Sequence, residues 1–446
     1  MTGESKVPTV PLSNMNIFRE QAVAIAYAGI AGADAGNLVS RAVSDGQIDR
    51  SLSRFYPVVV SAGKAAGAMA EAFMEALGCG GGGGLIACPY TLAGVGKMER
   101  FAVGHPVPND ESVRAGLRAL DLANNLSEKE VLVVLLSGGA SAGLAVPSEG
   151  ISSREKRVTT DVLLSSGVSI DGVNCVRKHL SAIKGGKLGL AARGRVLTLA
   201  ISDVVDPVPD DPTVIGSGPT VPDPTTFGDA LRVCCQLPLK DEVPQGVFEF
   251  LRRGALGEIA ETPRPGDIRL EDAVYRVIGT RLDAIESARQ KAVELGFTAI
   301  VLEEPVVGEA RLAADDYVEK VARLVWDIPR PACVISAGET TVKVVGPGSG
   351  GRNQEFALAS TGSLSRRFSS AVLASIGTDG IDGPTESAGA LIDTETFQRA
   401  QVLGLGHPED YLDRNDSSGF FAPLGDLIRT GPTNTNVGDL QIMLVG

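Results

Sequence analysis

Residues 131–143, VLVVLLSGGASAG, decide the fold of this chain. The first six residues are apolar without interruption, a pattern typical of a parallel strand that is buried on both faces of a sheet. A glycine-rich turn follows directly, and a helix is expected after it. Strand, tight turn and helix form the repeating unit of α/β folds, so we expect a parallel sheet that contains this strand.

The same unit recurs on both sides of this stretch. Toward the N-terminus, the apolar run at 55–60 leads into SAGK at 61–64 and then into an alanine-rich helix. Toward the C-terminus, the apolar run at 195–201 ends at Ser202 and Asp203. This alternation predicts a Rossmann-like parallel sheet with helices on both faces. Further helices are expected at 112–126, 154–168 and within 174–192.

The second half of the chain is predicted to form another α/β domain. The proline-rich segment 260–268 interrupts the pattern, so we place the two domains at 14–260 and 269–446. A strand-like run at 340–345, TTVKVV, closely follows the preceding strand and favours a mixed sheet. The other expected elements are strands at 275–279, 298–303, 332–337, 371–376 and 440–445 and helices at 282–295 and 309–326.

Composition narrows the class of protein. The chain has 446 residues with 43% hydrophobic content, which is ample for a buried core, and a net charge of −13, which argues against binding to nucleic acid. No CxxC pair occurs among six cysteines, and there are only three histidines, so we expect no structural zinc site. No apolar run is long enough to span a membrane, and no signal peptide is recognisable, so a cytoplasmic location is expected.

Two glycine-containing loops are candidates for binding phosphate. In the first, Ser137, Gly138, Gly139, Ala140 and Ser141 offer backbone N–H groups and two hydroxyls directly after a strand. An ordinary tight turn would have the same sequence. In the second, SAGK, Lys64 lies at an expected helix start, where the helix dipole disfavours a cation unless an anion compensates it. A solvent-exposed lysine is the alternative.

A basic segment lies at 174–188, where four cations surround His179. In an acidic protein such a cluster could bind the carboxylate or phosphate of a substrate, with Arg177 and Lys184 as the candidate ligands. A solvated helix face is the alternative. We expect His179 to be a hydrogen-bonded structural residue.

Acidic residues follow several strands. Asp203 ends the strand at 195–201 and Asp379 follows the strand at 371–376, positions where ligands gather in open parallel sheets. Carboxylate oxygens suit Mg²⁺, so both residues are candidate metal ligands. Three further aspartates after Asp203 are expected to build Asp-Pro turns; these are Asp206, Asp210 and Asp211.

The segment 336–355, SAGETTVKVVGPGSGGRNQE, holds the densest set of candidates. Glu339 follows a glycine at a strand end, and Arg352 follows a glycine run that could present its guanidinium to a carboxylate or phosphate. The glycines at 346, 348 and 351 match GxGxxG, which by itself is weak evidence for a dinucleotide site.

Taken together, these segments resemble the type II glycerate kinases, which carry a C-terminal MOFRL domain. The resemblance covers nearly the whole chain in the expected order. It rests on GHPVPN at 104–109, LSGGASA at 136–142, VRKHLSAIKGGKL at 176–188, SDVV at 202–205, IGSGPT at 215–220, GGRNQE at 350–355, GTDGIDGPT at 377–385 and NTNVGDLQI at 434–442.

The resemblance implies an ATP- and Mg²⁺-dependent kinase that converts D-glycerate to 2-phosphoglycerate in a cleft between two α/β domains. The catalytic lysine and arginine of the family match Lys64 and Arg352. We expect Asp203 to assist catalysis, and Glu339 and Asp379 to join the serine–glycine loop in binding the nucleotide. Its expected partners are therefore D-glycerate and ATP, without nucleic acid or membrane, and a homodimer is one option for its assembly.

Two other functions remain open from the residues alone. An NAD(P)H-dependent hydroxypyruvate reductase could use GPGSGG, but no acidic residue lies at the ribose-binding distance of about 20 positions after these glycines. A non-catalytic sensor of phosphorylated acids is the second alternative. The number of polar strand ends favours the enzyme.

Overall fold

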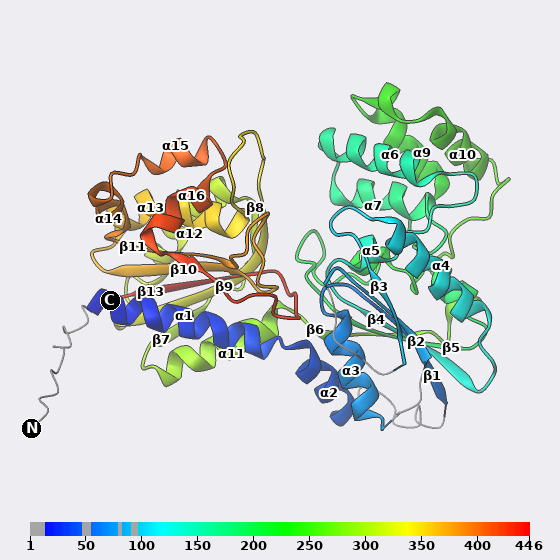
Figure 1. Cartoon of the computed structure of the whole chain (residues 1–446), viewed down its shortest axis with the longest axis horizontal. Helices are drawn as coiled ribbons and strands as arrows, with labels where there is room; N and C mark the ends of the chain where they lie inside the picture. Colours follow the sequence, from blue (N-terminus) through cyan, green and yellow to red (C-terminus); the bar gives the residue numbers. More distant parts are fainter. Residues whose placement is uncertain (1–13, 47–54, 79–82, 91–96) are drawn as a thin grey trace, which may run out of the picture. The chain divides into compact units, whose positions relative to one another are not determined.

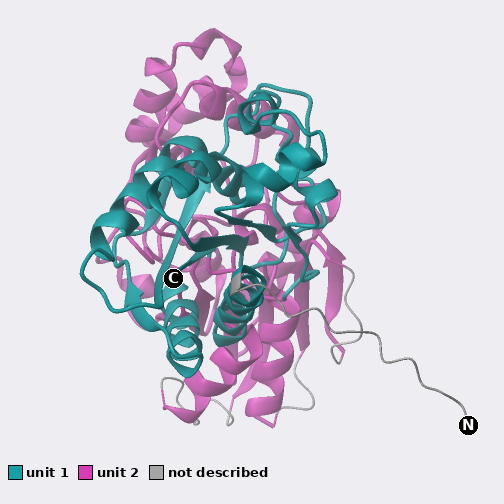
Figure 2. Cartoon of the chain, turned by 90° about the vertical axis from the view of Figure 1, so that its left-hand side faces the viewer, with its two compact units in different colours: residues 1–32, 281–433, 438–446 teal, residues 33–280, 434–437 magenta. Residues whose placement is uncertain are grey.

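The structure is a computed structural model, and it describes residues 14–46, 55–78, 83–90 and 97–446. The chain divides into two compact units, shown in two colours in Figure 2. Unit 2 comprises residues 33–280 and 434–437, and unit 1 comprises the described residues up to Gly32 together with 281–433 and 438–446.

Unit 2 is built on a six-stranded parallel sheet with the strand order β3-β2-β1-β4-β5-β6 (Figure 1). This is the strand order of the doubly wound dinucleotide-binding fold, in which the order reverses direction between the first and fourth strands. The predicted run at 131–136 is therefore a central strand, and every one of these residues is buried. The strands are β1 (Tyr56–Ala62), β2 (Gly83–Cys88), β3 (Glu99–Ala102), β4 (Glu130–Leu136), β5 (Arg195–Ile201) and β6 (Val274–Gly279).

Helices cover both faces of this sheet. Alternate residues of β1 and β4 pack with α4, α5 and α8 in one apolar cluster, while α3 contacts the sheet without contributing to that cluster, so it covers the opposite face. Four other helices, α6, α7, α9 and α10, share a separate apolar cluster. The helices are α2 (Ala35–Ser44), α3 (Ala66–Ala76), α4 (Asp110–Asn124), α5 (Ala140–Gly143), α6 (Ser153–Ser165), α7 (Ile170–His179), α8 (Lys187–Ala191), α9 (Phe227–Gln236), α10 (Gln245–Ala255) and the 3₁₀ turns η2 (Ile215–Ser217), η3 (Lys240–Glu242) and η4 (Ile268–Leu270).

Unit 1 contains a seven-stranded mixed sheet with the order β12-β11-β10-β13-β9-β7, and β8 pairs with β9. The strand β13 is antiparallel to both of its neighbours, β9 and β10. The strands are β7 (Thr298–Val301), β8 (Val306–Glu309), β9 (Ala332–Thr341), β10 (Ala371–Gly377), β11 (Gly389–Asp393), β12 (Leu427–Ile428) and β13 (Asp439–Val445).

Two apolar clusters lie on the two faces of the unit 1 sheet. One joins the sheet to α12 and α13, and the other joins it to α1 and α11. Arg19 of α1 also forms ion pairs with the buried carboxylates of Asp393 and Asp426, which fixes α1 to this unit. The helices are α1 (Asn14–Gly32), α11 (Arg281–Glu294), α12 (Ala310–Leu324), α13 (Arg352–Arg367), α14 (Thr396–Val402), α15 (Pro408–Leu412) and α16 (Ser417–Leu424).

The predicted fold class is confirmed, since one sheet is parallel and the other is mixed. The compact units, however, divide the chain differently from the predicted domains 14–260 and 269–446. Strand β6 follows the proline-rich segment yet pairs with β5 in the first sheet, and α1 packs in unit 1 with the C-terminal half of the chain. The predicted separate strand at 340–345 was wrong, because β9 continues to Thr341 and Val344 and Val345 are exposed in a loop.

No single described helix is long and apolar enough to cross a membrane, although the bent pair Met15–Gly32 and Ala35–Ser44 together meets that criterion by length and composition.

Candidate active site

The two glycine-containing loops meet at the point where the strand order of unit 2 reverses. SAGK leaves the carboxyl end of β1, and the serine–glycine loop leaves the carboxyl end of the adjacent β4. The backbone N–H of Lys64 donates to the carbonyl of Gly138 at 2.9 Å, and the N–H of Ala65 donates to Ser137 Oγ at 3.0 Å. Open parallel sheets bind ligands at this position.

Glycine is required where these loops pack against each other. Gly63 has a φ of +118°, and a Cβ atom there would lie 2.5 Å from the carbonyl oxygen of Ser137. Gly139 has a φ of +90°, and its Cβ would lie 2.9 Å from the ring of His105. His105 belongs to GHPVPN, one of the segments of the resemblance, but no local pattern marks it as a site residue.

Asp203 follows β5, the next strand of the sheet, and approaches the same loop. Its Oδ2 accepts a hydrogen bond of 2.7 Å from the side-chain amide of Asn436. A Cβ atom on Gly138 would lie 2.2 Å from Asp203 Oδ2 and 2.0 Å from Asn436 Nδ2, so glycine alone permits this arrangement. Three neighbouring strands therefore bring Lys64, Ser137, Gly138 and Asp203 together.

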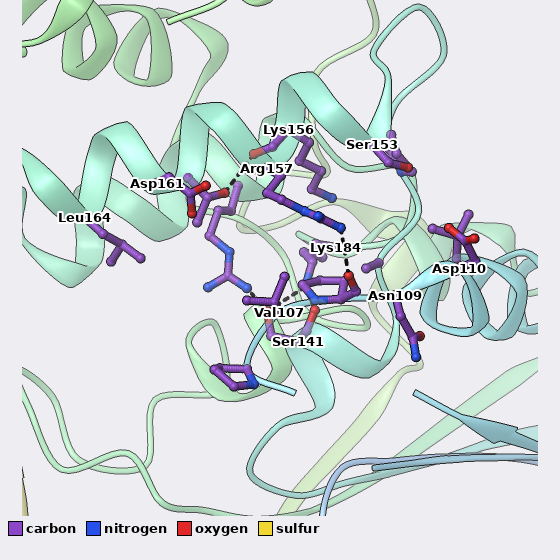
Figure 3. Close-up of a pocket in the computed structure, with 17 residues that line it drawn as sticks. Val107, Asn109, Asp110, Ser141, Ser153, Lys156, Arg157, Asp161, Leu164 and Lys184 are labelled. Atoms are coloured by element: carbon purple, nitrogen blue, oxygen red, sulfur yellow. Dashed lines mark hydrogen bonds between the residues drawn. The ribbon is translucent and has the colours of Figure 1, made fainter. Parts of the chain in front are cut away.

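The single turn α5 carries Ser141 to a group of cations. Ser141 Oγ accepts hydrogen bonds of 2.6 Å from Lys184 Nζ and from Arg177, and it lies 2.8 Å from Ser217 Oγ. Lys156 of α6 lines the same cavity (Figure 3). The predicted cluster therefore lies away from the solvated helix face that was the alternative, since Lys184 is buried and Arg177 is half-buried.

His179, in the middle of the basic segment, has the structural role that was expected. Its Nε2 lies 3.0 Å from Glu261 Oε1, and its Nδ1 lies 2.8 Å from the carbonyl oxygen of Cys175. Burial opposes ionisation of Glu261, but hydrogen bonds from His179 and from two backbone N–H groups lower its pKa to about 2. The turn role of Asp211 also holds, since its Oδ1 accepts from the N–H of Thr213 at 2.8 Å.

In unit 1, Arg352 begins α13 and is held by two carboxylates. Its guanidinium donates to Glu339 at 2.6 Å and forms an ion pair of 2.8 Å with Asp439, whose side chain is fully buried. Burial acts against the charged form, but Asp439 and Glu339 together raise the pKa of Arg352 above its usual range. Asn353 also donates to Asp439, at 2.9 Å, so this carboxylate is well fixed.

A second buried carboxylate, Asp382, supports the start of the same helix. Its two oxygens accept from the backbone N–H groups of Asn353 and Gln354 at 3.0 and 2.9 Å. Burial raises the pKa of Asp382 to about 6, although these hydrogen bonds act in the opposite direction. Asp379 lies nearby in sequence and is also buried, and its Oδ1 accepts from the N–H of Ile381 at 3.1 Å.

The glycines of the GxGxxG match pack against the protein itself. Cβ atoms on Gly346 and Gly348 would lie 2.3 and 2.5 Å from the backbone oxygen of Arg414, and one on Gly351 would lie 2.3 Å from Asp382. Their close approach therefore serves the packing of this loop against residues 382 and 414–416, and the match gives no support to a dinucleotide site.

The predicted site residues thus fall into two groups. Unit 2 brings together the Lys64 loop, Ser137–Ser141, Asp203, Arg177 and Lys184, whereas unit 1 brings together Arg352 and Glu339 and contains Asp379. Among the described residues, no group of three or more His, Cys, Asp or Glu side chains could hold a metal ion. The residues that the sequence analysis missed are His105, Lys156, Asn436 and Asp439.

The fold and these loops define a Rossmann-like α/β protein with a candidate ligand site at the strand-order reversal of its parallel sheet. Comparisons with known proteins show which family of this class the chain belongs to. A domain of unknown function, DUF4147, matches residues 21–252, and the MOFRL family matches residues 332–439.

The relatives include glycerate kinases and two proteins of Agrobacterium vitis named putative hydroxypyruvate reductase. A glycerate 2-kinase of Pyrococcus horikoshii is 36% identical over 395 residues, which cover 87% of both chains. A D-glycerate 2-kinase of Thermotoga maritima is 36% identical over 87% of this chain and 90% of its own. The crystal structure of glycerate kinase from Thermotoga maritima matches with a TM-score of 0.80 and 35% identity, covering 96% of this chain and 99% of that one. The chain belongs to the MOFRL-type glycerate 2-kinase family, and it is an enzyme of this type.

Proposed function

We propose that this enzyme transfers the γ-phosphoryl group of ATP to the 2-hydroxyl of D-glycerate, giving 2-phosphoglycerate and ADP. The observation that carries the proposal is the convergence of the Lys64 loop, the serine–glycine loop and Asp203 at adjacent strand ends. In this reaction the glycerate oxygen bonds to phosphorus as the bond to the β-phosphate breaks. Catalysis of such transfers depends mainly on positioning and on charge.

Lys64 and the serine–glycine loop supply the positive groups of unit 2. The ammonium group of Lys64 neutralises an oxygen of the transferring phosphoryl group, and Ser137–Ser141 hold the phosphates of the nucleotide. Because α5 is a single turn, its dipole contributes little, and the hydroxyl and N–H groups of the loop contribute more. Gly139 has a φ of +90°, and a side chain at this position would collide with the ring of His105.

Asp203 is the proposed ligand for Mg²⁺. Its carboxylate lies against Gly138, beside the loop assigned to the phosphates, and Mg²⁺ commonly binds one or two carboxylates together with substrate phosphates. The ion, when bound, neutralises charge on the β- and γ-phosphates. Asn436 fixes the carboxylate by its hydrogen bond. Asp379 stays a second candidate ligand.

Arg352 and Glu339 of unit 1 are proposed to complete the site in a cleft between the two units. Support comes from chain connectivity. Asn436 bonds to Asp203, and Asp439 bonds to Arg352. Asn436 and Asp439 are three positions apart in the chain. Their Cα atoms therefore lie at most about 11 Å apart in any arrangement of the units. Arg352 is assigned to the transferring phosphate or the glycerate carboxylate.

One assay tests the reaction against the reductase alternative. Purified protein is incubated with D-glycerate and either ATP with Mg²⁺ or NAD(P)⁺, and ADP and NAD(P)H are measured. We expect ADP and 2-phosphoglycerate in equal amounts, with the phosphate position read by ³¹P NMR. NAD(P)H without ADP would overturn the kinase proposal, and 3-phosphoglycerate would correct the position of transfer. The proposed partners are these small molecules, and the proposed location is the cytoplasm. A homodimer is the proposed assembly, and light scattering tests it.

Replacing Lys64 tests its role in the transfer. We expect Lys64→Ala to lower kcat by about 10²- to 10³-fold, the effect of losing one group that stabilises transition-state charge. The melting temperature should not change, because Lys64 is half-buried at a loop and not within the apolar core. Lys129→Ala, a change of an exposed lysine at the opposite end of the same sheet, is the matched control. Near-normal turnover of Lys64→Ala would remove this residue from the mechanism.

A further inference from the structure

Unit 2 contains a cavity of about 310 Å³ that opens beside the serine–glycine loop. Lys156 extends from α6 toward the side on which Ser141 and Lys184 lie (Figure 3). The helix that carries Lys156 is fixed by a capping box between Ser152 and Glu155. The apolar part of the wall includes Pro106, Val107, Pro108, Val113, Pro147 and Leu164.

Three cations of this cavity, Lys156, Arg177 and Lys184, have no carboxylate partner among the described residues. Lys184 is 2% exposed and donates to the carbonyl oxygen and the hydroxyl of Ser141. Arg177 donates to the same hydroxyl, and Lys156 donates to the carbonyl of Val146, at 3.4 Å. Asp110 and Asp161 also line the cavity, but neither forms an ion pair with these cations.

Such a cluster is unfavourable in the absence of an anion. Burial and the mutual repulsion of the cations lower the pKa of Lys156 to about 7 and lower that of Lys184 well below its usual range. Burial also lowers the pKa of Arg177. A protein that keeps buried cations together without carboxylates bears a cost in stability that an anionic ligand removes.

We propose that this cavity binds a nucleoside phosphate, with its phosphates on Lys156, Arg177 and Lys184 and its nucleoside against the apolar wall. The proposal rests on the proposed kinase function and names the site of its nucleotide. The cavity has the size of pockets that enclose drug-sized ligands, about 300 Å³ and above, so a three-carbon acid would leave most of it empty. Arg177 and Lys184, expected to bind substrate, are therefore assigned to the nucleotide, and Lys156 joins them.

Binding of such an anion has a measurable consequence for protons. A phosphate beside Lys156 favours its charged form and raises its pKa, so the complex takes up protons above pH 7 and the affinity falls as the pH rises. The charged groups that face Lys156 or line the same cavity are Arg157, Asp161, Arg177, Lys184, Lys187 and Asp110. Proton uptake distinguishes this site from one built on groups with ordinary pKa values.

The test is the binding of ADP by isothermal titration calorimetry, without glycerate, in two buffers of different ionisation enthalpy. We expect Lys156→Met to weaken ADP binding by about tenfold or more, as for the loss of one charge-assisted contact. Proton uptake at pH 7.5 should fall as well, while the KM for D-glycerate stays within about twofold. The ligand-free variant should melt at the same temperature as the wild type or higher, because a repulsive charge is removed.

Arg154→Met is the matched control, since Arg154 lies exposed on the same helix and does not line the cavity. It should bind ADP as the wild type does. An unchanged ADP affinity in Lys156→Met would overturn the assignment, and so would a raised KM for D-glycerate with unchanged ADP binding. Because ADP binding is measured without turnover, the two proposals fail separately. A protein that binds ADP through Lys156 but does not phosphorylate glycerate contradicts only the proposed reaction.

Discussion

Two cation sites among the described residues, one at Arg352 and one at Lys184, differ in what surrounds them. Arg352 in unit 1 has carboxylates on two sides, Glu339 and Asp439, and its pKa is raised. Lys184 in unit 2 has a serine hydroxyl, a carbonyl oxygen and two other cations as neighbours, and its pKa is lowered. One site is neutralised by the protein, and the other has an excess of positive charge.

The difference indicates different roles. A cation that is already paired keeps its position and charge whether or not a ligand is present, which fits the role in the reaction proposed for Arg352. A cation group without carboxylates gains most when an anion arrives from outside, so the cavity around Lys184 is suited to binding. Measurements of stability and affinity can separate the two cases. Removing the paired cation should lower the stability of the protein, whereas removing a cation of the cavity should weaken ligand binding without lowering stability.

The largest effect is expected from Arg352→Met. The buried carboxylate of Asp439 would lose its partner, so we expect a loss of about 3 kcal/mol in the free energy of unfolding, together with a fall in kcat of about 10³-fold. Urea denaturation and steady-state kinetics measure the two effects. Adding Asp439→Asn to this variant should restore part of the stability and none of the turnover. Wild-type stability in Arg352→Met would contradict the comparison, since Lys156→Met is expected to lose none.

The pH dependence of stability tests a buried carboxylate of unit 1, Asp382. Burial raises the pKa of Asp382 from 3.8 to about 6, so the neutral form is favoured in the folded protein. Its contribution is fully present below pH 3.8 and is lost as the pH rises through 6, by up to about 3 kcal/mol.

The variant Asp382→Asn stays neutral throughout this range. It gives up an acceptor for the N–H groups of Asn353 and Gln354, so it should be less stable at low pH. Its unfolding midpoints in urea should nevertheless decline less steeply than those of the wild type between pH 4 and 6.5. Equal slopes for the two proteins would show that Asp382 ionises normally.

The smallest effect is expected from a cation whose partner is exposed. Lys320 forms an ion pair of 2.8 Å with Glu304, and both side chains are largely in solvent. Such pairs contribute little because water and salt screen them. Lys320→Ala should therefore leave both the melting temperature and the KM values at wild-type levels. A clear loss in either would mean that an exposed ion pair contributes as much as the pairing of Arg352 with the buried Asp439.

Local patterns predicted most of the elements, because strands and helices follow from runs of apolar residues and from turns. The run at 131–136 is β4, and the run at 195–201 is β5. Long-range pairing was harder to infer. Strand β6 has an alternating, half-exposed pattern after a proline-rich segment, which looks like the start of a new domain. Its parallel pairing with β5 depends on contacts that no local pattern encodes.

The candidate site was predictable where a residue lies directly at a strand end. Lys64, Ser137 and Asp203 follow β1, β4 and β5, and strand ends of a parallel sheet lie at one edge. Lys156 was not predictable in this way, because SREKR at 153–157 has the composition of an exposed helix turn. Its position beside Arg177 and Lys184 comes from the packing of α6 on α7.

The central position of β13 has a consequence for how the protein is made. The strand lies between β9 and β10, so the sheet of unit 1 cannot be completed before residues 439–445 have been synthesised. Helix α1 belongs to that unit, and its apolar side, including Ile25, cannot pack on the sheet until the sheet has formed. At about 5–20 residues per second, the delay between the two segments is about 20–80 s. During that time α1 is a candidate for chaperone binding on the ribosome, whereas the long segment of unit 2 has already emerged.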